Sequence, residues 1–187
     1  MVIDPDEKKI TAYHESGHAL AALLLKHCDS PDKVSVIPRD MALGITSLLP
    51  GKERHNMSRE YLCDQMVMLL SGRAAEKIAC NTETAGAKND IERTTEMAIA
   101  MVCEYGMSEE LGPIAVNLGK NLTGNSLSVL QARAQDEVMK LIKDSYNKAR
   151  LLIEENNQLL HRVAALLIEK ETISGEDIKA LIEKTPE

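Results

Sequence analysis

Two histidines four positions apart, His14 and His18, lie inside a segment that is predicted to form one uninterrupted helix. Asp4 is a suitable N-cap and Pro5 a suitable first residue for this helix, which we expect to run to about Lys26. Because a helix repeats every 3.6 residues, the two imidazoles share one face, one turn apart. Two imidazoles at this spacing can bind one metal ion, so the fold must bring further polar groups to this face.

The five residues 14–18, His-Glu-Ser-Gly-His, match the HExxH pattern of zinc peptidases. Glu15 follows the first histidine, so its carboxylate can hold and deprotonate a water molecule beside the metal. Gly17 allows another segment to approach the helix closely. Two surface histidines at this spacing are the alternative interpretation, and the helical context favours a site for one Zn²⁺ per chain, with His14 and His18 as ligands and Glu15 as the catalytic base.

A catalytic zinc site needs a third protein ligand and one open position. Three acidic residues are candidates. Asp90 falls in the first turn of a predicted helix, Glu76 in a short helix among small residues, and Glu83 in a loop. The residue pattern alone ranks Asp90 and Glu76 about equally.

The composition excludes several other classes of function. The chain has four Tyr and no Phe or Trp, so its core is expected to consist of aliphatic side chains and methionine. Aromatic side chains that could stack on bases are scarce, and the net charge of -7 opposes binding to a phosphate backbone. We therefore expect no nucleic-acid partner.

The cysteines and the hydropathy indicate where such a chain would function. The four cysteines lie far apart and form no CxxC pair, which is typical of free thiols in a reducing compartment. No run of about 18 apolar residues is present, so we expect this chain neither to span nor to contact a membrane. No signal peptide is recognisable.

The remaining pattern predicts a mainly α fold with a small β-sheet in the N-terminal half, followed by a helical C-terminal part. We expect a single domain over residues 1–187, with an α+β part at about 4–118 that carries the metal site and a helical part at about 126–185. Ser71-Gly72 is expected to interrupt a helix, Asn89 to cap one, and Ser174 with Asp177 to form a capping box before the last one. The predicted strands are 33–38 and 43–48, and the predicted helices are 58–70, 73–79, 89–105, 127–155, one reaching about 170, and a short final one.

Several further stretches resemble the FtsH family of membrane-anchored, ATP-dependent zinc metalloproteases of the AAA class, which form peptidase family M41. Besides residues 14–18, these are Gly-Arg-Ala-Ala-Glu at 72–76, Ala-Gly-Ala-Lys-Asn-Asp at 85–90, Tyr-Gly-Met-Ser at 105–108 and Leu-Gly-Pro at 111–113. They occur in the family's order and extend the similarity over roughly residues 5–185. The joint match is far more specific than the zinc motif alone.

The resemblance implies that Asp90 is the third zinc ligand and that Glu76 has a structural or supporting role. It also implies a zinc endopeptidase that degrades unfolded or membrane-extracted proteins and assembles into a homohexamer. ATP and Mg²⁺ would belong to an AAA ATPase module that is absent from this chain, since no GxxxxGK[ST] loop is present. We expect the membrane anchor of the family to be absent from this chain as well. The full-length protein is expected in the bacterial inner membrane or an organelle membrane, with this domain on the cytoplasmic side.

The chain departs from the family pattern at Ser16 and Ala85, where Ala and Thr are usual, and over the loop 117–128. A substrate is expected to bind in extended form along the edge of residues 43–48. Tyr13 and His55 are candidates for stabilising the oxyanion by residue type only. The competing hypotheses are a non-catalytic zinc-bearing helical assembly module and a purely helical interaction domain.

Overall fold

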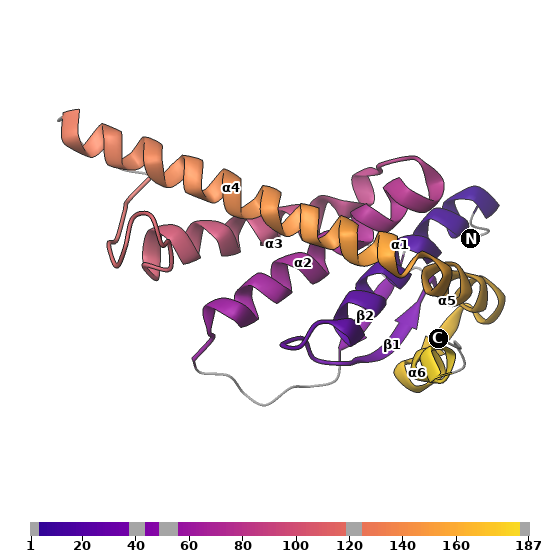
Figure 1. The fold of residues 1–187 in the computed structure, drawn as a ribbon. Coiled ribbons are helices and arrows are strands. Elements are labelled where there is room, and N and C mark those ends of the chain that lie inside the picture. Colours follow the sequence, from indigo (N-terminus) through magenta and orange to yellow (C-terminus); the bar gives the residue numbers. More distant parts are fainter. Residues whose placement is uncertain (1–3, 38–43, 49–55, 119–124, 184–187) are drawn as a thin grey trace.

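Two helices form the centre of the molecule in the computed structural model (Figure 1). The structure describes residues 4–37, 44–48, 56–118 and 125–183, without the side chains of 125–127. The two central helices are α1 and α2, and the sheet, α4 and α5 lie around them. The helices are α1 (Pro5–Leu24), α2 (Arg59–Ala75), α3 (Lys88–Ile99), α4 (Asn125–Glu155), α5 (Asn157–Lys170) and α6 (Gly175–Glu183), and the strands are β1 (Pro31–Ser35), β2 (Ile45–Leu48) and β3 (Thr172–Ser174). The predicted fold class, mainly α with a small sheet, is confirmed.

Helix α1 begins as the sequence predicts. The Asp4 side chain accepts hydrogen bonds from the backbone N–H groups of Asp6 and Glu7, which would otherwise be unpaired in the first turn. Every residue from 15 to 22 is buried. A helix that is buried on all sides must be covered on all sides, and α1 packs against α2, α5 and the sheet.

Helices α1 and α2 touch backbone to backbone. A Cβ atom at Gly17 would lie 2.4 Å from the carbonyl oxygen of Ser71 and 2.8 Å from the Cβ of Ala75. The predicted interruption at Ser71-Gly72 is wrong, since α2 continues to Ala75 and then through a π-helical turn to Cys80. Gly72 instead provides space for a side chain of α1, and the Ser71 hydroxyl donates to the Val67 carbonyl within the helix at 2.8 Å.

The sheet has the order β2-β1-β3, with antiparallel pairs in which Val34 lies opposite both Thr46 and Ile173. The first two strands are predicted at 33–38 and 43–48, whereas β1 begins earlier, at Pro31, and ends at Ser35, and β2 begins at Ile45; residues 38–43 lie outside the described part of the chain. Strand β3 is a correction to the helical C-terminal part. It has three residues, too few to show an alternating pattern, and it follows Glu171, whose backbone is left-handed at φ 60°.

Helix α3 starts differently from the prediction. Asn89 is not its N-cap, because a 3-10 turn at Ala85–Ala87, capped by the Thr84 side chain, leads directly into Lys88. At its other end a π-helical turn, Ala100–Glu104, carries the chain to Gly106, whose φ of 62° ends the helix as predicted.

The C-terminal helices follow the predicted layout. α4 packs on α2 and α5 on α1, and α6 packs beside β3. The capping box before α6 is confirmed, since the Ser174 backbone N–H donates to Asp177 Oδ2 at 2.9 Å and the Asp177 N–H donates to Ser174 Oγ at 3.2 Å. The division of the single domain near residues 118–126 stays a prediction.

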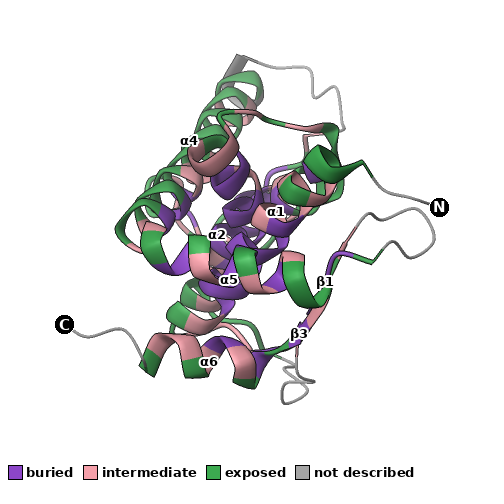
Figure 2. Cartoon of the chain, turned by 90° about the vertical axis from the view of Figure 1, so that its right-hand side faces the viewer, coloured by how far each residue is buried: buried purple, intermediate pink, exposed green. Residues whose placement is uncertain are grey.

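The buried interior is aliphatic, as the lack of Phe and Trp predicts. Figure 2 shows buried residues concentrated on the inner helices, with exposed residues on the outer faces of α4 and α6. Among the largest fully buried side chains of the described residues, Glu76 is the charged one. No disulfide links any of the four cysteines, which all lie in the described part of the chain, and none of the described helices combines the length and apolar character needed to cross a bilayer.

The contact of α1 with α2 leads to a prediction at two adjacent buried positions. Gly17→Ala should destabilise the protein by about 1–3 kcal/mol, because overpacking against a backbone oxygen outweighs the higher helix propensity of alanine. Ser16→Ala should instead stabilise it by about 1 kcal/mol, because the Ser16 hydroxyl is buried with no hydrogen-bond partner among the described residues. Urea unfolding of chelator-treated protein measures both changes. A stabilising Gly17→Ala would contradict the close helix contact.

Candidate metal centre

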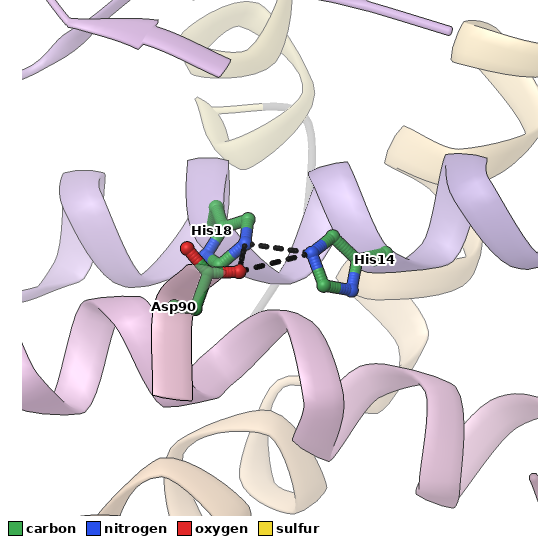
Figure 3. A group of neighbouring side chains, drawn as sticks. All are labelled: His14, His18 and Asp90. Atoms are coloured by element: carbon green, nitrogen blue, oxygen red, sulfur yellow. Dashed lines mark hydrogen bonds and ion pairs between the residues drawn. The ribbon is translucent and has the colours of Figure 1, made fainter. Parts of the chain in front are cut away.

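Three side chains from two helices converge at one point (Figure 3). His14 and His18 project from α1, and Asp90 from the first turn of α3. The Nε2 atoms of the histidines are 3.0 Å apart, and Asp90 Oδ2 lies 3.4 Å from His14 Nε2 and 3.3 Å from His18 Nε2. Two ligands, each about 2.0–2.1 Å from a tetrahedral zinc ion, lie roughly 3.3 Å apart, so these separations fit a single zinc.

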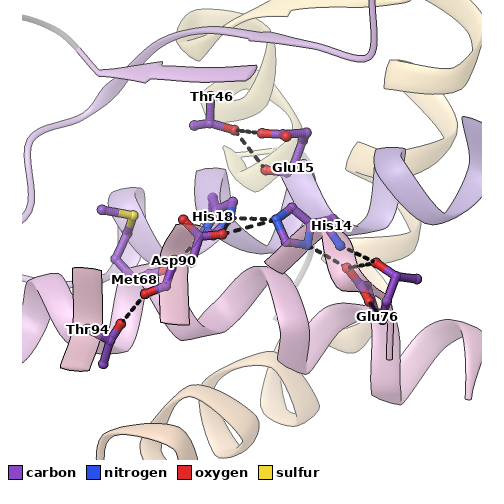
Figure 4. Close-up of polar contacts among 10 residues, drawn as sticks. His14, Glu15, His18, Thr46, Met68, Glu76, Asp90 and Thr94 are labelled. Carbon is purple, nitrogen blue, oxygen red and sulfur yellow. Dashed lines mark hydrogen bonds and ion pairs between the residues drawn. The ribbon is translucent and has the colours of Figure 1, made fainter. Parts of the chain in front are cut away.

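The outer nitrogen of each imidazole has an acceptor. His14 Nδ1 lies 2.7 Å from Glu76 Oε1, and His18 Nδ1 lies 2.9 Å from the carbonyl oxygen of Met68 (Figure 4). A carboxylate and a carbonyl both accept, so each Nδ1 carries the hydrogen and each Nε2 is left with a lone pair. Two lone pairs that face each other at 3.0 Å require a cation or a proton between them.

The electrostatics of the cluster also favour positive charge. Burial lowers the pKa of His14, but hydrogen bonds to Asp90 and Glu76 and the charge of Glu15 outweigh burial and raise this pKa to about 9. Burial raises the pKa of Asp90, yet its close contacts with the imidazoles of His14 and His18 outweigh burial and hold this pKa well below its ordinary value. Asp90 is therefore ionised at neutral pH and available to a metal ion.

Glu76 lies on the far side of the His14 ring from Asp90. Its carboxylate is 1% exposed and also accepts from the Thr84 backbone N–H at 2.8 Å and the Thr84 hydroxyl at 3.2 Å. Since it faces Nδ1, it cannot share an ion with Nε2 of the same ring. Its position suits the supporting role that the sequence analysis expected.

Glu83 lies outside this cluster and pairs with Arg73 at 3.2 Å. Of the two candidates for oxyanion stabilisation, Tyr13 points to α5, where its hydroxyl lies 2.7 Å from His161 Nδ1. His55 lies outside the described residues. In the part of the chain that the structure describes, His14, His18 and Asp90 are the one group of metal-binding side chains whose ligand atoms all lie within 4.8 Å of one another.

Glu15 is 7% exposed and its carboxylate faces strand β2. Helix α1 rotates by about 100° per residue, which directs Glu15 to one side of the face that carries the histidines. A cavity of about 870 Å³ joins these groups, and its lining includes His14, Glu15, His18, Asp90 and residues of β2. A carboxylate, a candidate metal position and space for a ligand thus occur together.

Comparison with known proteins decides the family. The model of peptidase family M41 matches residues 1–181. The chain belongs to peptidase family M41. It is 44% identical to the ATP-dependent zinc metalloprotease FtsH of Acidobacterium capsulatum over 98% of this chain and 30% of that protein. It is also 40% identical to FtsH 3 of Symbiobacterium thermophilum, over 98% of this chain and 31% of the relative.

This M41 chain spans about 30% of the length of the curated relatives it matches. The family is one of peptidases, and both relatives are named zinc metalloproteases. Thr46 and Thr84, which contact Glu15 and Glu76, are not among the residues predicted for the site. A single threonine carries no periodic or spacing signal, so only the fold reveals these contacts.

The three acids considered for the M41 site should differ in their effect on zinc affinity. Asp90→Ala should abolish stoichiometric zinc binding, because it removes an oxygen that faces both Nε2 atoms. Glu76→Ala should weaken binding by about 10- to 100-fold through the loss of His14 orientation. Glu83→Ala, the matched control, should leave affinity unchanged. Competition with a chromophoric chelator measures all three, and an equal loss in Asp90→Ala and Glu76→Ala would contradict this assignment.

Proposed function

We propose that this M41 chain is a zinc endopeptidase domain in which His14, His18 and Asp90 bind one Zn²⁺ and Glu15 is the general base. The convergence of the three ligand atoms beside the Glu15 carboxylate, in one cavity, carries the proposal. Bound zinc would supply a Lewis acid that polarises the scissile carbonyl and makes water more acidic.

The side chains of this site have two further roles, proton transfer and orientation of the imidazoles. Glu15 takes the proton of the attacking water and passes it to the leaving amine. Glu76 and the Met68 carbonyl hold the two imidazoles in the tautomer that leaves Nε2 free.

Strand β2 is proposed to receive the substrate. It pairs with β1 on one side and is the outer strand of the described sheet, and Gly44, Ile45, Thr46 and Leu48 line the same cavity as Glu15. An extended segment that adds to such an edge binds through its own backbone groups, which tolerates many side chains. We therefore infer that unfolded or membrane-extracted polypeptides are the substrates.

The whole protein is proposed to couple this domain to an ATP-driven unfoldase. The relatives are named ATP-dependent, whereas these 187 residues contain no GxxxxGK[ST] loop. We further propose a homohexamer anchored in the bacterial inner membrane or an organelle membrane, with this domain on the cytoplasmic side. Nucleic acid is not an expected partner, because the net charge is -7.

The role of Glu15 can be tested by Glu15→Gln, which removes the base and preserves the shape of the side chain. Hydrolysis of denatured casein should fall by about 10²- to 10⁴-fold or more, because a general base contributes this range. Zinc content should stay at one ion per chain, since Glu15 is not proposed as a ligand. Loss of zinc in this variant would reassign Glu15 as a ligand, and a zinc-loaded wild-type chain without hydrolysis would favour the non-catalytic assembly module.

The proposed mode of substrate binding predicts a preference for unfolded chains. A stable folded protein seldom exposes the extended segment that strand addition requires, so this chain should digest a denatured protein and spare its folded form. ATP should change neither rate, and a chelator should stop digestion. The assay follows one protein in both forms, and efficient digestion of the folded form would contradict the proposal.

A further inference from the structure

One hydroxyl group contacts the proposed base. Thr46 Oγ1 donates to Glu15 Oε2 at 2.6 Å, and it lies 3.2 Å from the Glu15 carbonyl oxygen (Figure 4). A hydroxyl carries one hydrogen, and the shorter contact leads to the charged, stronger acceptor. The donated bond therefore goes to the carboxylate.

Strand β2 and Gly44, the residue before it, lie against the Glu15 carboxylate. A Cβ atom at Gly44 would lie 2.7 Å from Glu15 Oε1, so the glycine leaves space for that oxygen while Thr46 binds the other. Among the described residues, Thr46 is the donor observed for this carboxylate. Without it, rotation about the Glu15 side-chain torsions would be restrained by packing alone.

Thr46 is held firmly enough to direct Glu15. It pairs with Val34 in the ladder between β2 and β1, and its β-branched side chain has few rotamers. The Thr46 side chain is partly buried, whereas the neighbouring residues Ile45 and Ser47 are exposed. Thr46 therefore lies on the face of the sheet that packs against α1. A short bond from a restricted side chain on a strand fixes the carboxylate more precisely than a bond from a loop would.

We propose that Thr46 is a positioning residue for hydrolysis: its hydroxyl holds Glu15 Oε2 and so fixes the orientation of the carboxylate that takes the proton of the attacking water. This inference rests on the proposed role of Glu15 as general base. Because the proposed substrate edge is the same strand, the element that receives the peptide also orients the base.

Three variants test the proposal. Thr46→Val removes the hydroxyl and keeps the shape, Thr46→Ser keeps the hydroxyl, and Thr95→Val makes the same chemical change on the exposed face of α3, where the hydroxyl bonds the Ile91 carbonyl at 2.8 Å. With denatured casein, kcat of Thr46→Val should fall about 10- to 100-fold, the rate equivalent of losing a hydrogen bond to a charged group. KM should change by less than about twofold, because substrate binding is not affected.

The controls separate positioning from packing. Thr46→Ser should restore kcat to within about threefold of wild type, and Thr95→Val should match wild type. Zinc content should be unchanged in all three variants, and each variant should keep the circular dichroism spectrum of the wild-type fold. Added to Glu15→Gln, Thr46→Val should cause no further loss, because its effect passes through Glu15. A crystal structure of Thr46→Val should show the Glu15 carboxylate rotated away from its wild-type position.

Several results would overturn the proposal. These are an unchanged kcat in Thr46→Val, an equally slow Thr46→Ser, or a change confined to KM, which would make Thr46 a substrate-docking residue. If the zinc-loaded wild-type chain proved inactive, the proposed function would fail separately. The crystal structures would then decide, and a Glu15 carboxylate that keeps its position in Thr46→Val would exclude a positioning role.

Discussion

The close contact of α1 with α2 is the constraint on which the site depends. Gly17 removes the side chain that would separate the helices, and Gly72 leaves the space that the imidazoles occupy, since a Cβ there would lie 2.5 Å from His18 Nε2. At this separation the end of α2 brings Glu76 to His14, and the Met68 carbonyl reaches His18. A wider helix pair would lose both contacts and leave the imidazoles without a fixed orientation.

The charges at this contact favour a bound cation. The carboxylates of Glu15, Glu76 and Asp90 surround two imidazoles, and all five side chains are buried or nearly so. Burying a charge is costly unless it is paired and hydrogen-bonded, and each of these carboxylates has at least one partner. A metal ion between the Nε2 atoms and Asp90 would complete this pairing.

Local signals in the sequence predicted the parts of the structure that local interactions determine. The HExxH spacing placed two imidazoles on one helix face, and Asp4 and Ser174 marked helix starts that the structure confirms. Ser71-Gly72 was predicted to interrupt the helix because glycine is a poor helix former. The helix continues through it, and Gly72 is needed there because it leaves space for His14 and His18 of α1. Strand β3 and the contact of Thr46 with Glu15 involve partners far apart in the chain, so no local pattern could reveal them. Between Glu76 and Asp90, the residues alone left the third ligand open, and the family resemblance favoured Asp90.

The proposed function requires one zinc ion between α1 and α3. Anomalous diffraction from crystals of the zinc-loaded protein, recorded above and below the zinc absorption edge, tests it most directly. We expect one strong peak within about 2.0–2.2 Å of Nε2 of both histidines and of an Asp90 carboxylate oxygen. A peak bound by Glu76 or Glu83 in place of Asp90, or one that lies away from His14 and His18, would contradict it.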